Sequence, residues 1–238
     1  MASSTNSEPG SRRSFLTRIG ALSGLALVSP LTATSELGAE TRTTEPPTAA
    51  PAFNLAWIDH LRGRHKQVFD LGGIDLGGHD VGKGETPLRV VRNYLNAHRD
   101  VYSLAYPDIN TVVGIAGEAF PINATDPIWV KYSLGEKWKI KDPKTGTWAV
   151  RNVYADPSDS LDDKGTSVQA MVKRGTIFWQ CNNALNGVVQ MLADAMKLEV
   201  PAVRAELVAG LMPGVHLVPA HTMALGLVQE RGCTYEKM

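Results

Sequence analysis

Apolar runs and helical patterns alternate along most of the chain. Five short β-rich runs recur, at Val68–Leu71, Thr111–Gly117, Thr176–Gln180, Val215–Pro219 and Cys233–Glu236. Helical patterns separate most of them. Strands that alternate with helices favour a parallel sheet whose two faces are both covered by helices. The pattern therefore predicts a three-layer α/β domain with a mostly parallel, five-stranded sheet.

Five segments carry the helical pattern, and the strongest is Asn183–Leu198, in which apolar side chains gather on one side. Proline begins one of the others and glycine follows another, as is typical of helix ends. The remaining four predicted helices are Pro87–Val101, Ser167–Lys173, Val203–Leu211 and His221–Arg231.

The alternation breaks between the second and third predicted strands, over residues 136–151. Two stretches of alternating polar and apolar residues flank the turn-forming sequence Asp-Pro-Lys-Thr-Gly. This order predicts a β-hairpin insertion. Its tryptophans, Trp138 and Trp148, are expected to pack the hairpin onto the domain rather than to bind a ring-shaped ligand.

Composition narrows the class of protein. Lys plus Arg and Asp plus Glu both number 24, so the formal net charge is zero and no basic footprint indicates a nucleic-acid or anionic-lipid partner. The two cysteines are too few for a disulfide-rich scaffold, a four-cysteine zinc site or an iron–sulfur cluster, and the c-type haem motif is missing. No cofactor is therefore predicted.

The amino end has the character of an export signal. Arg12 and Arg13 precede Phe15 and Leu16, and a weakly apolar segment of about 13 residues follows. A bilayer span needs about 20 residues, so no stable membrane span is expected after processing. The paired arginines resemble the twin-arginine signal, which implies transport of the folded protein to the periplasm by the twin-arginine translocase.

These observations divide the chain into three parts. Residues 1–39 form the expected signal peptide, although the sequence does not mark its cleavage site. Residues 40–52 are rich in Thr, Pro and Glu, which predicts a disordered linker. Residues 53–238 form the α/β domain with its hairpin insertion.

The cysteine Cys181 stands where an apolar run stops and a helical pattern starts. This position places it at the carboxyl end of a parallel strand, where open α/β sheets present their ligand sites. Asn182 or Asn183 is expected to cap the next helix, leaving the thiol beside unpaired amide N–H groups. Such surroundings stabilise the thiolate, which is the nucleophilic form of cysteine. The alternative is an inert, buried cysteine.

Two further residues near the carboxyl end bear on this site. His221 follows the fourth predicted strand at the start of a helix, so it is expected to approach Cys181. It would act there as an acid or base, or only cap its helix. Cys233 lies at the amino end of the last strand, which is the opposite rim of the sheet, so a disulfide with Cys181 is not expected.

A glycine-rich stretch at residues 72–84 follows the first strand. It matches neither the dinucleotide-binding nor the phosphate-loop motif, because Lys83 is followed by glycine rather than Ser or Thr. We therefore predict a flexible loop at the rim that carries Cys181. Gly78, His79 and Asp80 are its candidate binding residues.

The carboxyl-terminal sequences GTIFWQCNNAL and LMPGVHLVPAHTMALGLVQERGCTY resemble the DsrE/DsrF-like family. In that family a strand ends in a cysteine closely followed by asparagine, and a later Pro-Gly-Val strand leads to a closing Gly-x-x-Tyr. The likeness covers roughly residues 65–236. It implies a flavodoxin-like fold and a homo-oligomer. It also implies that Cys181 carries sulfur as a persulfide between a donor and an acceptor protein.

Two hypotheses about function follow. In the first, the chain is an exported thiol protein that transfers sulfur on Cys181. In the second, it is a non-catalytic binding or assembly module whose ligand sits at a rim formed by residues 72–84, Cys181 and His221. A metal site made by Cys181, His221 and His79 is a third arrangement, but the histidine spacing contains no metal-binding pair and no metal is predicted.

Overall fold

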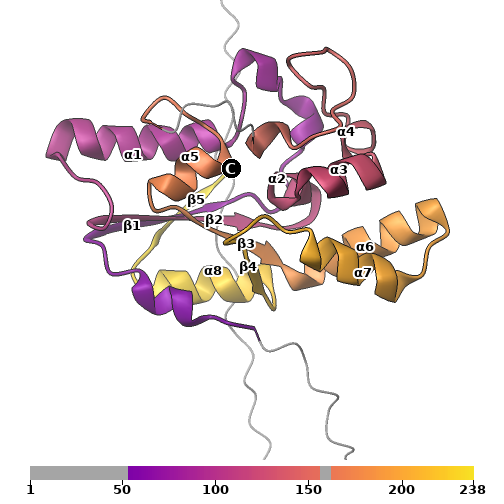
Figure 1. Ribbon diagram of the computed structural model, residues 1–238. Coiled ribbons are helices and arrows are strands. Elements are labelled where there is room, and N and C mark those ends of the chain that lie inside the picture. Colours follow the sequence, from indigo (N-terminus) through magenta and orange to yellow (C-terminus); the bar gives the residue numbers. More distant parts are fainter. Residues whose placement is uncertain (1–52, 156–161) are drawn as a thin grey trace, which may run out of the picture. The chain divides into compact units, whose positions relative to one another are not determined.

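Five parallel strands form one sheet in the order β4-β3-β2-β1-β5 (Figure 1). The computed structural model describes residues 53–155 and 162–238. Its strands are β1 (His65–Asp70), β2 (Ile109–Ile115), β3 (Ile177–Cys181), β4 (His216–Val218) and β5 (Thr234–Lys237). The predicted parallel α/β sheet is therefore confirmed.

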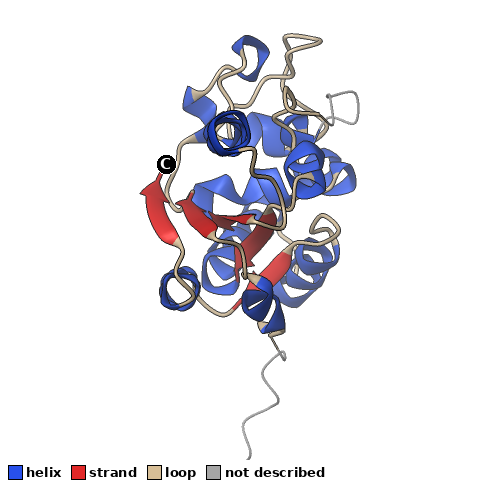
Figure 2. Cartoon of the chain, turned by 90° about the vertical axis from the view of Figure 1, so that its left-hand side faces the viewer, coloured by secondary structure: helices blue, strands red, loops and turns tan. Residues whose placement is uncertain are grey.

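Helices cover both faces of the sheet (Figures 1 and 2). The α-helices are α1 (Leu88–Tyr102), α2 (Phe120–Asn123), α3 (Asp126–Tyr132), α4 (Leu134–Lys137), α5 (Val168–Lys173), α6 (Asn182–Met196), α7 (Val200–Ala209) and α8 (His221–Glu230). The 3-10 helices are η1 (Ala56–His60), η2 (Leu76–Gly78), η3 (Val81–Lys83), η4 (Gly117–Ala119) and η5 (Val153–Ala155).

Side chains that alternate along the inner strands build two separate cores. Phe69 and Val113 belong to the larger core, which α1, α5 and α6 cover. Their neighbours Val68 and Val112 belong to the smaller core, which α8 and η1 cover. β1 and β2 therefore contribute to both cores, as the period of two requires, whereas all four residues of β5 are exposed.

The strand order explains why α8 lies opposite α1. From β1 to β4 every connection moves in one direction across the sheet, but after β4 the chain returns to place β5 beside β1. Right-handed crossovers that run in opposite directions place their helices on opposite faces. Flavodoxin has its second strand at the edge next to β1, whereas here the last strand takes that place.

Residues 120–150 differ most from the expectation. Helices α2, α3 and α4 were not predicted, and α4 takes up the start of the predicted first hairpin strand. Lys139 has a left-handed backbone with φ of 56°, which ends any extended run there. The hairpin is thus reduced to a chain reversal closed by the single antiparallel bridge of Lys141 with Trp148. Trp138 is buried, whereas Trp148 is 43% exposed.

The expected signal residues Arg12, Arg13, Phe15 and Leu16, and the expected linker at 40–52, lie outside the described residues. In the described ranges no helix is both long and apolar enough to cross a bilayer.

Candidate functional site

The sulfur of Cys181 accepts hydrogen bonds from two helix amino ends. Cys181 ends β3 and caps α6, and its Sγ accepts from the backbone N–H of Ala184 at 3.4 Å. A second backbone N–H, that of His221 at the first position of α8, donates to the same sulfur at 3.2 Å. Amides in the first turn of a helix have no carbonyl partner and carry partial positive charge. The arrangement therefore favours a negative charge on this sulfur.

The helix cap lies earlier than the predicted Asn182 or Asn183. Cys181 keeps an extended backbone, with φ of −71° and ψ of 121°, and its own side chain accepts the capping bond. Asn182 instead accepts a hydrogen bond from Arg204 of α7 at 2.7 Å, and Asn183 is exposed. The expectation that an asparagine caps α6 was wrong, because the strand continues to the cysteine itself.

His221 approaches Cys181 through its backbone, while its ring is bonded elsewhere. Nδ1 accepts from the indole Nε1–H of Trp179 at 3.2 Å, and Nε2 lies 2.6 Å from Oδ1 of Asp70. An indole nitrogen can only donate, so Nδ1 carries no proton and Nε2–H must donate to Asp70. The ring thus fixes the first residue of α8, whose backbone N–H faces the sulfur.

Asp70 belongs to this hydrogen-bonded group, although the sequence did not single it out. It ends β1, is 5% exposed, and accepts from the backbone N–H of Gly72 and the ring of His221 on Oδ1. On Oδ2 it accepts from Tyr235 at 2.7 Å and from Lys237 at 3.2 Å. In the sequence, Asp70 is an acidic residue near the end of the predicted strand Val68–Leu71, and Gly72 and Gly73 follow that strand.

The charge of Asp70 is stabilised where it lies. Burial by itself raises the pKa of the Asp70 carboxyl, but the hydrogen bonds from Tyr235, Gly72 and His221 together lower the pKa below its usual value. The carboxylate therefore remains an acceptor for the His221 ring at neutral pH.

Two glycines make room for the Asp70–His221–Trp179 chain. A Cβ atom on Gly114 would lie 2.3 Å from Cζ2 of Trp179 and 3.0 Å from Cε1 of His221. A Cβ atom on Gly72 would lie 2.9 Å from Nε2 of His221. Real Cβ contacts are not this short, so a side chain at Gly114 would displace the indole that fixes the ring.

A second polar group supports the end of β3 from the other face. Asn123 and Gln180 are fully buried. The Asn123 amide donates to the Trp179 carbonyl at 3.1 Å and to Oε1 of Gln180 at 3.2 Å, and Gln180 donates to the Cys181 carbonyl at 3.4 Å. Oδ1 of Asn123 has no hydrogen-bond partner among the described residues. This group was not predicted, because α2 was not.

The contacts of the glycine-rich loop do not bring its candidate residues to Cys181. Gly78 is exposed, and Asp80 accepts from the backbone N–H of Gly82 and pairs with Lys83 at 3.3 Å. His79 lines a separate surface pocket with the start of α1 and the last residue of the chain. Within residues 53–155 and 162–238, no group of three metal-ligating side chains is placed to hold an ion.

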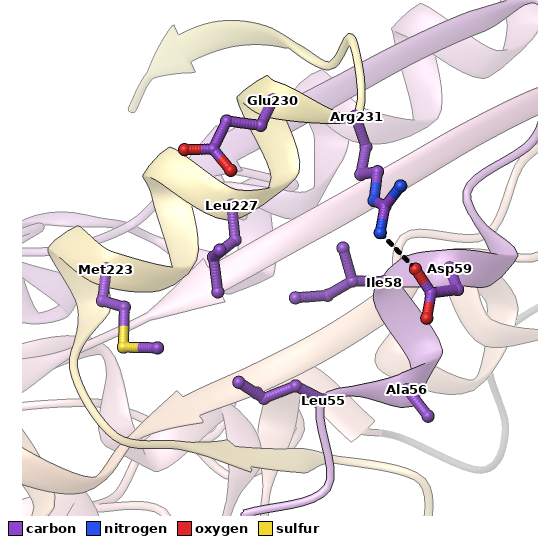
Figure 3. Close-up of a pocket in the computed structure, with 8 residues that line it drawn as sticks. All are labelled: Leu55, Ala56, Ile58, Asp59, Met223, Leu227, Glu230 and Arg231. Carbon is purple, nitrogen blue, oxygen red and sulfur yellow. Dashed lines mark hydrogen bonds and ion pairs between the residues drawn. The ribbon is translucent and has the colours of Figure 1, made fainter.

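A further groove lies between η1 and α8, on the surface of the smaller core (Figure 3). Leu55, Ile58, Met223 and Leu227 line it, and an ion pair between Asp59 and Arg231 lies at its side. Its lining includes neither Cys181 nor any residue of the Asp70–His221–Trp179 chain.

Comparisons with known proteins identify no family. Neither the protein-family models nor the curated proteins contain a match. A solved structure that resembles this chain is the protein of unknown function MTH1491 from Methanobacterium thermoautotrophicum, with a TM-score of 0.34 and 14% sequence identity. The alignment covers 73% of this chain and 99% of that chain. The resemblance to the DsrE/DsrF-like family stays a prediction from sequence.

Proposed function

We propose that this chain is an exported thiol protein that carries sulfur as a persulfide on Cys181. The observation that carries the proposal is the pair of backbone N–H groups directed at one sulfur atom. They belong to two helices that follow different strands, so both helix dipoles act on the same atom. The twin-arginine-like amino end and the DsrE/DsrF-like sequence motifs support the same conclusion.

The transfer step requires no added oxidant or reductant. The Cys181 thiolate attacks the terminal sulfur of a persulfide donor, and a new S–S bond forms on Cys181. The S–S bond of the donor breaks, and the donor leaves as a thiolate with the electron pair of that bond. The acceptor then removes the terminal sulfur by the same exchange, which restores the Cys181 thiolate.

The burial of Cys181 restricts the donor. The residue is only 3% exposed, so a bulky disulfide would not reach Sγ without displacing neighbouring atoms. The terminal sulfur of a persulfide is a single atom at the end of a chain, so it needs less space than a disulfide. A donor or acceptor protein would therefore present its sulfur on a projecting side chain or a small thiol.

Intact mass spectrometry after incubation with glutathione persulfide tests the proposal. We expect one added sulfur atom per chain in the wild type and in Cys233→Ser, and none in Cys181→Ser. Circular dichroism of all three proteins checks that they are folded. Loading that persists in Cys181→Ser, or that never occurs in the wild type, would contradict the sulfur-carrier proposal.

The second candidate is a non-catalytic binding or assembly module with the same fold. The low exposure of Cys181 favours this second function, because a buried sulfur that accepts two amide hydrogen bonds can have a purely structural role. Cys181→Ala and His79→Ala separate the two functions. If Cys181→Ala retains every interaction and cellular phenotype of the wild type and His79→Ala does not, the pocket beside α1 is the functional one and the thiol is structural.

A further inference from the structure

Arg174 carries a buried donor without a partner. It caps the carboxyl end of α5, just before β3, on the rim of the sheet opposite Cys181. Its Nη1 is buried, and within the described residues no acceptor lies within hydrogen-bond distance of it. A buried donor without an acceptor is unfavourable, because it has lost its hydrogen bonds to water and nothing replaces them.

The neighbouring arginines are satisfied, in contrast. Arg99 binds Asp163 at 2.6 Å and Asp100 at 2.7 Å. Arg92 donates to the carbonyl of Lys164 at 3.2 Å and to its neighbour in the chain. The nearby carboxylates Asp100 and Asp163 are therefore engaged by Arg99.

The electrostatic surroundings of Arg174 agree with this geometry. Burial, and then the positive charge of Arg99, lower the pKa of the Arg174 guanidinium. The carboxylates of Asp163 and Asp100 oppose this shift without reversing it. A full negative charge beside Arg174 would stabilise it further.

A pocket of about 340 Å³ lies directly beside Arg174. This volume is at the lower end of the range of small-molecule sites, about 300–1,000 Å³. Two cationic side chains besides Arg174, two aspartates and four mainly apolar residues complete its lining. These are Arg99, Lys173, Asp162, Asp163, Leu95, Leu104, Ala105 and Tyr106.

We propose that this pocket binds a small organic carboxylate. The carboxylate group would lie against Arg174 and Lys173, and the apolar body of the ligand against Leu95, Leu104 and Tyr106. The site is independent of the chemistry of Cys181, since it lies at the amino ends of the strands.

The chemistry of the lining favours a carboxylate over a phosphate. The planar guanidinium fork matches the two oxygens of a carboxylate. A phosphate would bring a larger charge close to Asp163, and it would leave the apolar walls without contacts. A monovalent anion with a hydrocarbon body satisfies both halves of the pocket.

Isothermal titration calorimetry with hexanoate, benzoate and cyclohexanecarboxylate tests the site on the full chain. We expect saturable binding of at least one acid and none of its neutral amide. Arg174→Gln should weaken that binding roughly tenfold or more, because a charge-assisted hydrogen bond is lost. Arg92→Gln is the matched control: it removes one positive charge from a residue outside the pocket and should leave the affinity unchanged.

Stability measurements keep the test independent of folding. Since Arg174→Gln removes a partly buried charge and the unpaired donor Nη1, its free energy of unfolding should equal or exceed that of the wild type. The proposal is overturned if none of the acids binds, if Arg174→Gln and Arg92→Gln weaken binding equally, or if inorganic phosphate binds and the acids do not.

Discussion

Cys181 and Cys233 are both buried on the same side of the sheet, 3% and 6% exposed, yet their surroundings are opposite. Cys181 ends a strand and meets two helix amino ends. Cys233 precedes a strand and lies in the apolar core with Val68 and Val228. Burial raises the pKa of the Cys233 thiol to about 11, although Lys66 opposes the shift. Burial alone therefore makes a thiol inert, and amide donors distinguish the candidate site.

The direction of the sheet is the physical reason for this contrast. In a parallel sheet every strand runs the same way, so all carboxyl ends point toward the amino ends of the following helices. The opposite rim receives helix carboxyl ends, whose partial charge is negative. A thiolate is therefore stabilised at the carboxyl ends of the strands and destabilised at their amino ends.

The largest expected difference is in alkylation. With iodoacetamide near pH 8, Cys181 should react faster than Cys233, because two amide N–H groups face its sulfur whereas burial raises the pKa of the Cys233 thiol to about 11. Cys233 should become reactive only as the pH approaches about 11. Rates measured on Cys233→Ser and Cys181→Ser assign each thiol. Equal rates for the two thiols of the folded protein would remove the contrast.

Gly114→Ala should lower the free energy of unfolding by about 2–3 kcal/mol, because the added Cβ overlaps the Trp179 indole in a closely packed core. Urea unfolding measures the change in free energy. Gly187→Ala on α6 is the matched control, since no atom lies within 4 Å of its added Cβ. That variant should be unchanged or more stable by up to about 1 kcal/mol. If both variants lost the same stability, overlap with the indole would not be the cause.

Asp70→Asn should lower the free energy of unfolding by about 1–2 kcal/mol at pH 7, because the His221 ring and Tyr235 lose a charged acceptor. The pKa of Asp70 is lower in the folded state than its ordinary value of 3.8. The carboxylate therefore stabilises the fold above about pH 3.8, and this stabilisation is lost as the pH falls through the folded pKa.

The difference in unfolding free energy between wild type and Asp70→Asn should accordingly shrink as the pH falls from 5 to 3. Urea titrations across that range measure it. Asp59→Asn removes an exposed partner of Arg231 and should have little effect. A difference that stays constant with pH would show that the charge of Asp70 does not stabilise the fold.

The sequence by itself determined the layered α/β fold and the place of Cys181 at a strand end. Apolar positions recur every two residues in a strand and about every 3.6 residues in a helix. Each element can therefore be recognised from its own segment of the sequence. The predicted helices and strands match the observed ones closely where these periods are clear, as in α6 and β3.

Only the tertiary structure decided how the site is assembled. Asp70 and His221 are 151 positions apart in the chain, and they meet because β5 returns past β1 and places α8 across the sheet. The partner of each ring nitrogen, the second amide on Cys181 and the unpaired Nη1 of Arg174 all depend on segments distant in sequence. No local period encodes such contacts, because they result from the packing of whole elements against one another.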